Sequence, residues 1–595
     1  MQHGRSFRRS LFLVLSLLSA CAASSPSPYE AGAGAAGAHD GRQAVAGAFL
    51  AGRFAAMESD LDFAADEFLR ALAIEPDNPE LRQQAFLACL MVGRPDAVRL
   101  AQGQPDDETA QLLLADRDAA SGNWAAAENR FAALPRQGPT QGLTQLLQPM
   151  LVAWAQQGAG HTDAALTTLH PFIEGQRSRF IYALHGALIA DLAGRTAEAG
   201  RLYRIAQTEY GPPTLELARV IASWQARQGH AAEAAETLKA SADLNPELAI
   251  ALPALQAVAG ERVIRRATDG LAEVYLVLAA ALHQQDAGAL SMLMLRLAID
   301  LRPDGTPARL LATDIAEATK HPDTGLLLLT PVTADDPLIG IVRLHRATLT
   351  EEIGRPEDAL HQMEQIARDY PDRPEPYISQ GDILRVQHHY TDAVAAYDKA
   401  IARVGTPTRL DWPLFYDRGI ALEQSKDWPR AESDFLTALK LAPDQPYVLN
   451  YLGYSWTEQG HNLPRARQMI ERAVEQRPND GAIIDSLGWV MLRQGDTAGA
   501  VKSLERAVEL MPEDATLNGH LGDAYWAAGR TATICSTAWR CSPRSATPCA
   551  PRRPRRFRWR WRGLSAAPCR PCPTTWCCAP PAGWRSWRGF AAARA

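Results

Sequence analysis

The chain has 595 residues, of which 47% are hydrophobic and 22% are charged, and its formal net charge is −6. The charge is uneven, because residues 531–595 contain 13 arginines and no lysine, aspartate or glutamate. The rest of the chain is therefore strongly acidic, which argues against general nucleic-acid binding and against attraction to anionic lipid. Most cysteines lie between Cys535 and Cys578, so the remaining chain has no disulfide framework.

The N-terminus has the pattern of a bacterial export signal. Several arginines precede an apolar run over residues 11–20, which is too short to span a bilayer as a helix. The run leads into the quartet Leu18-Ser19-Ala20-Cys21, which resembles the bacterial lipobox. The resemblance implies a signal peptide over residues 1–20 and lipidation of Cys21, which would become the first mature residue.

The alternative is an ordinary signal peptide cut near Ala20 or Ala23, with the cysteine incidental. Acyl chains contribute about 0.8 kcal/mol per buried CH₂, and two or more chains suffice for stable anchoring. Alanine and not aspartate follows Cys21. By resemblance to enterobacterial sorting, this favours a lipid anchor in the outer membrane of the bacterial envelope, facing the periplasm. A cytoplasmic protein would have to retain residues 1–20.

Residues 21–44 are rich in alanine, glycine, serine and proline, which predicts a flexible tether between membrane and body. Residues 32–37 match the glycine pattern of dinucleotide-binding loops by letters alone. No strand pattern precedes them and no βαβ unit follows, and that context gives such glycines their mechanical role. We therefore expect no nucleotide site here, and no cofactor.

Residues 45–339 show a helix–turn–helix rhythm. The first unit spans 45–78, with Gly52 and Phe68 at the positions where two paired helices would meet. Further on the pattern weakens, but glycines recur at spacings of about 35 residues near the ends of first helices, where a left-handed cap favours glycine. These glycines are Gly122, Gly158, Gly194 and Gly229.

Residues 340–530 carry the clearest repeats. Pro478 and Pro512 are 34 residues apart, and so are Ala473 and Ala507. The last complete copy has Leu487, Gly488, Ala500, Leu504, Ala507 and Pro512 at the small, apolar and turn positions of a helical hairpin. The copy before it has Gly453, Ala466, Ile470, Ala473 and Pro478, and the one before that Gly419, Ala431, Phe435, Ala438 and Pro443.

This pattern resembles the tetratricopeptide repeat. A hairpin with one apolar face cannot bury that face alone, so the resemblance implies an all-α fold, an α-solenoid of stacked hairpins. Residues 45–339 would then be divergent copies and 340–530 a well-defined array. Gly488 and Ala500 are expected where the two helices of a pair approach most closely, and Ala507 where the next unit packs.

The tail, residues 531–595, interrupts a repeat, because a new copy begins at Leu517 and its second helix never follows. Its arginines and tryptophans are open to interpretation as a basic arm for nucleic acid or membrane, and its cysteines as a metal site. We favour a reading-frame change near residue 530 that yields a disordered segment. The array would then end on a half repeat with an apolar face exposed.

No catalytic motif is found. The chain lacks a His-Glu-x-x-His helix, a phosphate loop ending in Gly-Lys-Ser/Thr and a Gly-x-Ser-x-Gly elbow. The lone Cys89 falls in an apolar stretch and is expected in the core. We therefore predict no enzyme, no cofactor and no metal.

The family resemblance implies a scaffold that binds other proteins in a groove formed by first helices. Carried over, the outward positions of the best repeats would take a partner's peptide segment or helix. They are Asp382, Arg385, Tyr416, Ile420, Asn450, Tyr454, Asp485, Trp489, Arg493, Asp523 and Trp526. Tyr454 and Trp489 are equally consistent with packing between hairpins. The alternative function is a regulatory or assembly subunit of an envelope enzyme or export complex, and a cytoplasmic scaffold or an enzyme in its own right remain further readings.

Overall fold

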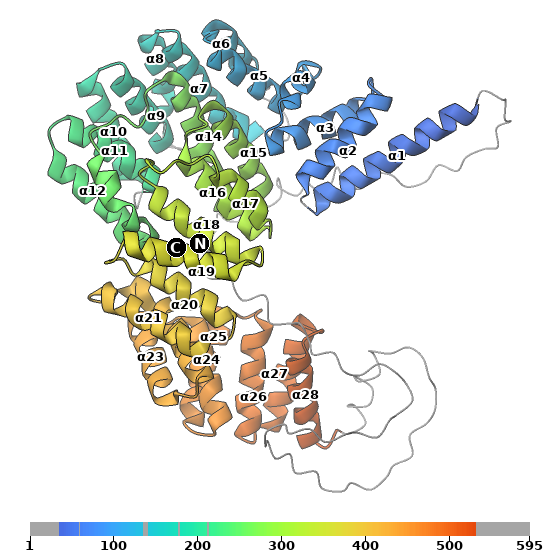
Figure 1. Ribbon diagram of the computed structural model, residues 1–595, viewed down its shortest axis with the longest axis vertical. Helices are drawn as coiled ribbons and strands as arrows, with labels where there is room; N and C mark the ends of the chain where they lie inside the picture. The colour runs from blue at the N-terminus through green and yellow to red at the C-terminus, as the bar shows by residue number, and fades with distance from the viewer. Residues whose placement is uncertain (1–34, 59, 135–140, 176–178, 211–213, 531–595) are drawn as a thin grey trace. The chain divides into compact units, whose positions relative to one another are not determined.

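The computed structural model describes residues 35–58, 60–134, 141–175, 179–210 and 214–530 (Figure 1). These residues form α-helices and short 3₁₀ turns, and no strand occurs among them. The predicted all-α class, an α-solenoid of helical hairpins, is therefore confirmed. The predictions for the signal peptide, Cys21 and residues 531–595 lie outside the described residues.

The chain divides into two compact units. Unit 1 comprises residues up to 410 together with 420–426, and unit 2 comprises 411–419 together with the residues from 427 onward. The turn η5 (Arg409–Asp411) and helix α22 (Trp412–Gln424) contain residues of both units. The remaining helices of unit 2 are α23 (Trp428–Leu441), α24 (Pro446–Gln459), α25 (Leu463–Gln476), α26 (Gly481–Arg493), α27 (Thr497–Leu510) and α28 (Ala515–Ala527).

Unit 1 is made of less regular hairpins, whose helices range from 6 residues in α13 to 23 in α1. Its elements are α1 (Ala35–Met57), α2 (Leu61–Ile74), α3 (Pro79–Val92), α4 (Asp96–Gln102), α5 (Glu108–Ala120), α6 (Trp124–Ala133), α7 (Gln141–Gly158), α8 (Thr162–Ile173), α9 (Arg179–Leu192), α10 (Thr196–Tyr210), α11 (Leu215–Arg227), α12 (Ala231–Leu244), η4 (Pro246–Ile250), α13 (Leu252–Ala257), α14 (Ala267–His283), α15 (Gly288–Leu301), α16 (Thr306–Ala318), α17 (Pro322–Leu329), α18 (Ile339–Glu352), α19 (Pro356–Asp369), α20 (Glu375–Val386) and α21 (Tyr390–Val404).

Helix α1 starts earlier than the sequence analysis placed the array. It begins at Ala35, so residues 35–44, expected to be tether, are helical. Their alanines favour a helix as much as a linker. A buried face further along α1, at Val45, Ala48 and Ala55, packs against the second helix of the hairpin, and a packed helix extends easily through good helix formers.

The hairpins of unit 2 pack a glycine of the first helix against a bulky residue of the second. A Cβ atom added to Gly488 would lie 2.5 Å from Cγ of Leu504, and one added to Gly453 would lie 2.8 Å from Cγ1 of Ile470. The predicted close approach is therefore confirmed. The same pairing occurs at Gly419 with Phe435 and, in unit 1, at Gly381 with Tyr397 and at Gly52 with Phe68.

Unit 1 also contains contacts between hairpins that are far apart in sequence. The Trp154 side chain of α7 is fully buried and lies against Gly270 of α14, where an added Cβ would be 2.3 Å from the indole. The Tyr275 hydroxyl donates to Asp116, 159 residues away, and Arg117 bonds Asp300, 183 residues away. Helices α14 and α15 thus lie against α3, α5 and α7 (Figure 1). Unit 1 differs from a solenoid in which each hairpin contacts only its neighbours.

One predicted helix cap falls on a different glycine. Gly122, Gly194 and Gly229 have positive φ as expected, but in the hairpin of α7 and α8 the left-handed residue is Gly160, with φ 83°, and not Gly158. Gly158 is the last residue of α7, and an added Cβ there would be 2.3 Å from the Trp124 ring. It is needed for close helix packing, and the turn follows two residues later.

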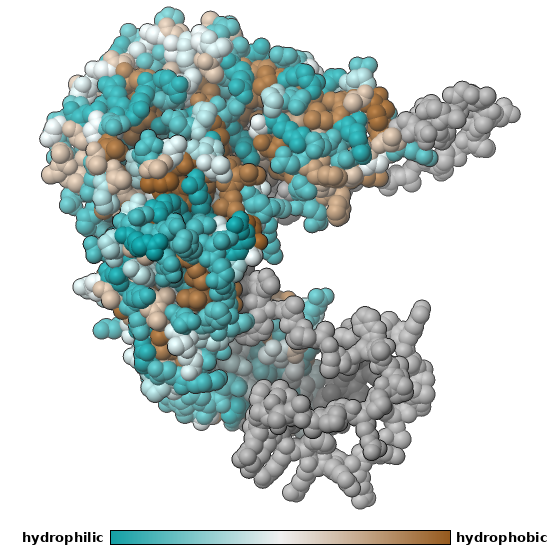
Figure 2. Space-filling view, viewed as in Figure 1, coloured by the Kyte–Doolittle hydropathy of each residue, from teal (hydrophilic) through white to brown (hydrophobic). Residues whose placement is uncertain are grey.

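Both ends of the described array leave apolar side chains exposed. On α1, Leu50, Phe54 and Met57 are 65%, 67% and 79% exposed, and Figure 2 shows hydrophobic residues gathered over the first hairpins. On α28, Trp526 is 65% exposed, and a Cβ added to Gly522 would meet nothing within 4 Å. Gly522 occupies the position of Gly488, so the described part of the last repeat presents an uncovered helix-packing face.

Candidate functional site

The predicted groove residues lie on first helices, but in different surroundings. Asp382 and Arg385 are on α20 of unit 1. The others in unit 2 are Tyr416 on α22, Asn450 and Tyr454 on α24, Asp485, Trp489 and Arg493 on α26, and Asp523 and Trp526 on α28. Helix α26 contacts both α24 and α28, so the first helices of three consecutive repeats form one continuous face.

An aromatic cluster occupies the middle of this face. The ring of Trp489 stacks on the imidazole of His520, with centroids 4.2 Å apart and planes 19° apart. The ring of Tyr454 lies 6.5 Å from the same imidazole. Stacking at this distance adds dispersion and quadrupole attraction to simple burial. Three successive first helices are thus tied together by half-buried rings, and part of each ring faces solvent.

Two polar side chains stand beside the rings with unused hydrogen-bonding capacity. Asp485 is 4% exposed, and its Oδ2 atom lies 2.8 Å from Nδ1 of His520. Its Oδ1 atom and Oδ1 of Asn450 are buried and accept no hydrogen bond from the described residues. Buried acceptors normally receive a hydrogen bond, so both oxygen atoms are suited to accept hydrogen bonds from a bound molecule. We call Asn450, Tyr454, Asp485, Trp489 and His520 the first-helix face.

The edge of the first-helix face is held by Glu458 of α24. Nε1 of Trp489 donates to Oε1 of Glu458 at 2.5 Å, and the Arg493 guanidinium lies 4.0 Å from the same carboxylate. The Arg493 guanidinium also lies 5.9 Å from the centroid of the Trp489 ring. These contacts fix the indole orientation, because a charge-assisted hydrogen bond and a cation–π contact act on it together.

Other predicted residues serve packing. The Tyr397 hydroxyl donates to Asp382 at 2.7 Å, and Arg385 bonds the same tyrosine, so both side chains tie α20 to α21. The Tyr416 ring contacts Phe435 and Tyr451 with centroids 6.1 and 5.7 Å away. All three side chains are part-buried, and their contacts lie within a hairpin or between adjacent first helices.

His520 and Glu458 were missed by the sequence analysis. A signal for His520 was present, because Asn450, Asp485 and His520 follow one another at intervals of 35 residues. That interval also separates Gly453 from Gly488. Following the column one repeat further would have found the imidazole. Glu458 lies one helical turn after Tyr454, which the pattern of outward positions did not include.

The described residues contain no group of histidine, cysteine, aspartate or glutamate side chains that could hold a metal ion. Cys89 is fully buried in the core as expected, and burial raises the pKa of its thiol to about 11, so it stays protonated near neutral pH. In the part of the chain with coordinates, we find no helix with the length and apolarity needed to cross a membrane.

Three solved structures are similar to parts of this chain. YrrB, a TPR protein with an unusual peptide-binding site, is 20% identical over 30% of this chain and 89% of its own, with a TM-score of 0.26. The Cut9–Hcn1 hetero-tetramer of the APC/C is 15% identical over 83% and 93%, with a TM-score of 0.35. A tetratricopeptide repeat protein from Parabacteroides merdae is 16% identical over 42% and 98%, with a TM-score of 0.32.

Sequence comparison points to the same repeats as the hairpin geometry. A TPR repeat-containing protein of Pseudomonas aeruginosa is 28% identical over 163 residues, and this match spans 27% of each protein. Most of that relative's length therefore lies outside the match. The tetratricopeptide repeat family model matches residues 346–406, 416–481 and 486–533. These residues coincide with the helices from α18 to α28, and this part of the chain is similar to the tetratricopeptide repeat family.

Proposed function

We propose that this protein is a non-enzymatic scaffold that binds a partner protein on the first-helix face of unit 2. The stacked pair of Trp489 and His520, beside the unsatisfied acceptors of Asn450 and Asp485, is the observation that carries the proposal. Aromatic rings supply contact area with little loss of side-chain entropy, and the acceptors suit main-chain or side-chain N–H groups of an extended segment. Such a surface selects by contact and performs no bond chemistry.

The scaffold acts, in this proposal, at the bacterial cell envelope. The support is in the sequence, where the apolar run 11–20 leads into the lipobox-like quartet ending in Cys21. Lipidation there would hold the body on a membrane, and the alanine after the cysteine favours the outer membrane. The test is the mass of the mature N-terminus. A product beginning with an acylated Cys21 is expected, and any other start contradicts the anchor while leaving the binding surface untouched.

The binding surface is tested by crosslinking and pull-down of the mature protein from envelope fractions. Trp489→Ala should weaken capture of the bound protein by about 2 kcal/mol or more, because buried tryptophans dominate binding energies. Phe63→Ala is the matched control, since Phe63 is a 48% exposed aromatic residue on a second helix of unit 1. Equal capture by the wild type and the Trp489 variant would contradict the assignment.

A second candidate function is the control or assembly of an envelope enzyme or export complex. It uses the same surface and differs only in the nature of the partner. Co-purification of a catalytic partner whose rate changes when the scaffold is added would favour this function. A partner without such a change favours the plain scaffold.

A further inference from the structure

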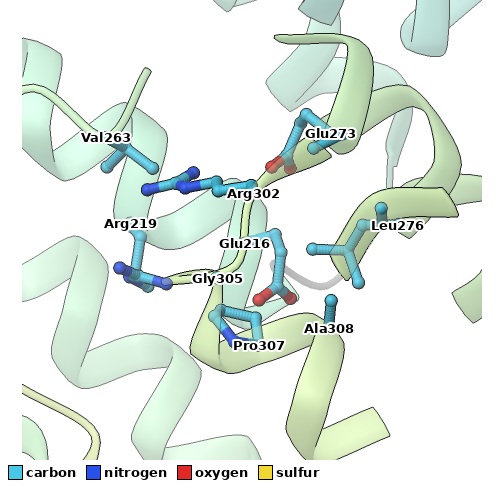
Figure 3. Close-up of a pocket in the computed structure, with 11 residues that line it drawn as sticks. Glu216, Arg219, Val263, Glu273, Leu276, Arg302, Gly305, Pro307 and Ala308 are labelled. Carbon is cyan, nitrogen blue, oxygen red and sulfur yellow. The ribbon is translucent and has the colours of Figure 1, made fainter. Parts of the chain in front are cut away.

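The interior of unit 1 leaves no room for a ligand where its charged side chains gather. A hollow of about 20 Å³ is lined by Glu216, Arg219, Glu273 and Arg302, and Figure 3 shows their two carboxylates and two guanidiniums around it. Opposite charges compensate one another there, and the hollow admits about one water molecule. The outer surface of the same unit differs, because its first helix exposes large apolar side chains.

Helix α1 carries these apolar side chains in one row along the helix. Leu50, Phe54 and Met57 follow one another at intervals of four and three residues, which places them on the same face. They are 65%, 67% and 79% exposed. Gly47 continues the row one turn earlier, and a Cβ added to it would meet nothing within 4 Å. We call Gly47, Leu50, Phe54 and Met57 the outer stripe.

No described helix covers the outer stripe. The opposite face of α1 packs against α2, where the ring of Phe68 lies against Gly52. The next first helix, α3, is covered on its other side by α2 of the preceding hairpin. Among the described residues, α1 has no preceding hairpin (Figure 1). The outer face of a terminal repeat is normally polar, so an apolar one indicates a surface that binds something.

The segment next to α1 lacks the side chains needed to cover this surface. Residues 22–34 lie between Cys21 and the start of α1, and they consist of alanine, glycine, serine and proline with one tyrosine and one glutamate. Apolar contacts stabilise in proportion to the area they bury, and small side chains supply little area. The partner of the outer stripe is therefore expected outside this segment.

The proposed lipid anchor brings the outer stripe close to a bilayer. Even when fully extended, the 13 residues of 22–34 span at most about 50 Å, so an acylated Cys21 keeps α1 near the membrane surface. A bilayer offers an apolar phase just below its headgroups, where exposed leucine, phenylalanine and methionine side chains are readily buried. Because the other face of α1 is packed against α2, the helix can only lie along such a surface.

The charges beside the outer stripe indicate the kind of lipid. Helical geometry places Arg53 on one side of the stripe and Glu58 on the other. The Arg53 guanidinium lies 5.9 Å from the centroid of the Phe49 ring, and it forms no ion pair among the described residues. Glu58 is exposed. One cation and one anion suit a headgroup with a phosphate and an ammonium group better than an anionic headgroup.

We propose that the outer stripe lies at the boundary between headgroups and acyl chains of a zwitterionic phospholipid bilayer. This inference rests on the proposed envelope location, and it adds a second membrane contact beside the lipid anchor. A single attachment at Cys21 leaves the body free to turn. A helix held in the plane of the membrane fixes the direction in which the array leaves the surface.

The test is photo-crosslinking of the mature protein, isolated from envelope membranes and reconstituted in vesicles of phosphatidylethanolamine and phosphatidylcholine. Phe54→benzoylphenylalanine should give about tenfold more lipid adducts than Trp526→benzoylphenylalanine, a 65% exposed position on α28, because only Phe54 would contact acyl chains. Equal yields at the two positions, or no lipid adduct at position 54, would overturn the proposal. Adducts at position 54 to a second copy or to another protein, in place of lipid, would overturn it in favour of a protein partner.

A charge placed in the stripe provides a second readout. Leu50→Glu should lower the yield of lipid adducts at position 54 by about tenfold or more, because a carboxylate is costly among acyl chains. Leu244→Glu is the matched control on α12, where Leu244 is 48% exposed, and should leave the yield unchanged. Circular dichroism confirms folding of each variant. A folded Leu50 variant with an undiminished yield would contradict the proposal.

The mass of the mature N-terminus, measured on the same sample, separates this inference from the proposed anchor. An acylated Cys21 without lipid adducts at position 54 overturns the membrane contact of α1 and keeps the anchor. Lipid adducts at position 54 on a chain with any other start keep the membrane contact and remove the anchor.

Discussion

Units 1 and 2 use the same hairpin but assemble it differently. In the complete hairpins of unit 2 each glycine of a first helix meets a residue of its own hairpin, as Gly488 meets Leu504. In unit 1 some glycines meet tryptophans, and Gly270 meets one from a hairpin seven helices earlier. The regular unit leaves half-buried rings and unsatisfied acceptors on the first-helix face. The irregular unit encloses its charged groups in its interior, as at Glu273.

This difference shows how repeats diverge. Where a pattern is kept, packing is local and the outward positions are free to bind. Where the pattern is lost, side chains from distant hairpins fill the space between helices. Burial then shifts the pKa of enclosed residues such as Glu273. Four predictions sharpen or break this comparison, from the largest expected effect to the smallest.

Trp154→Ala should lower the free energy of unfolding of unit 1 by about 3–5 kcal/mol, as expected for removal of a fully buried large aromatic residue. The change also removes the hydrogen bond that Trp154 donates to Nδ1 of His185 at 3.1 Å. Urea denaturation followed by circular dichroism measures the loss. Trp489→Ala in unit 2 removes a half-buried indole and should cost clearly less, so equal losses would contradict the contrast between the two units.

Glu273→Gln should stabilise unit 1 at alkaline pH. The pKa of Glu273 rises from 4.5 to about 7 on folding, so the folded state holds the proton more tightly than the unfolded state. Protonated Glu273 favours the folded state, and this contribution to the free energy of unfolding is complete below pH 4.5. It is lost as the pH rises through 7 and the buried carboxyl ionises. Removing the charge should therefore add about 3 kcal/mol at pH 8 and little near pH 4.5.

Urea midpoints at the two pH values, with Glu236→Gln as the exposed control, measure this difference. A gain of the same size at both pH values would contradict the pKa of Glu273 as its origin. It would point instead to altered packing by the amide. A variant that is less stable at pH 8 would mean that the Glu273 carboxylate is well solvated in the folded protein.

Gly488→Ala should destabilise unit 2 by about 1–3 kcal/mol, because the new methyl group would lie 2.5 Å from Leu504. Gly522→Ala occupies the same place in the next repeat with nothing within 4 Å. It should be neutral or should stabilise by up to about 1 kcal/mol, because alanine favours a helix more than glycine does. Thermal unfolding of the two variants compares them directly, and similar losses would show that the face of α28 is covered in solution.

The smallest effect concerns a turn found in both units. Lys320 in unit 1 has φ 64°, where the next hairpin has Gly354, and Asn462 in unit 2 has φ 53°. Left-handed backbone is strained for lysine and tolerated by asparagine. Lys320→Gly should therefore stabilise by up to about 1 kcal/mol and Asn462→Gly by less. The melting temperatures of the two variants measure both effects. A larger gain for Asn462→Gly than for Lys320→Gly would contradict backbone strain as the cause.

The regular repeats were predictable because their contacts are periodic. The spacing of Gly488, Ala500 and Leu504 fixes which residues of one hairpin touch, and the structure places them together. The contact of Trp154 with Gly270 does not recur from repeat to repeat, so no local sequence pattern predicts it. Part of the first-helix face followed from the outward positions, which found Tyr454 and Trp489. His520 was missed because it comes from an incomplete repeat.

The long-range contacts of unit 1 have a consequence for how the chain folds during synthesis. Asp116 and Arg117 leave the ribosome long before their partners, which follow 159 and 183 residues later. Contacts of such sequence separation slow folding, whereas hairpins that contact only their neighbours close as soon as both helices have emerged. We expect the side chain of Trp154 to stay partly exposed until α14 has been synthesised. During that time the early helices of unit 1 present apolar surface that a chaperone can bind.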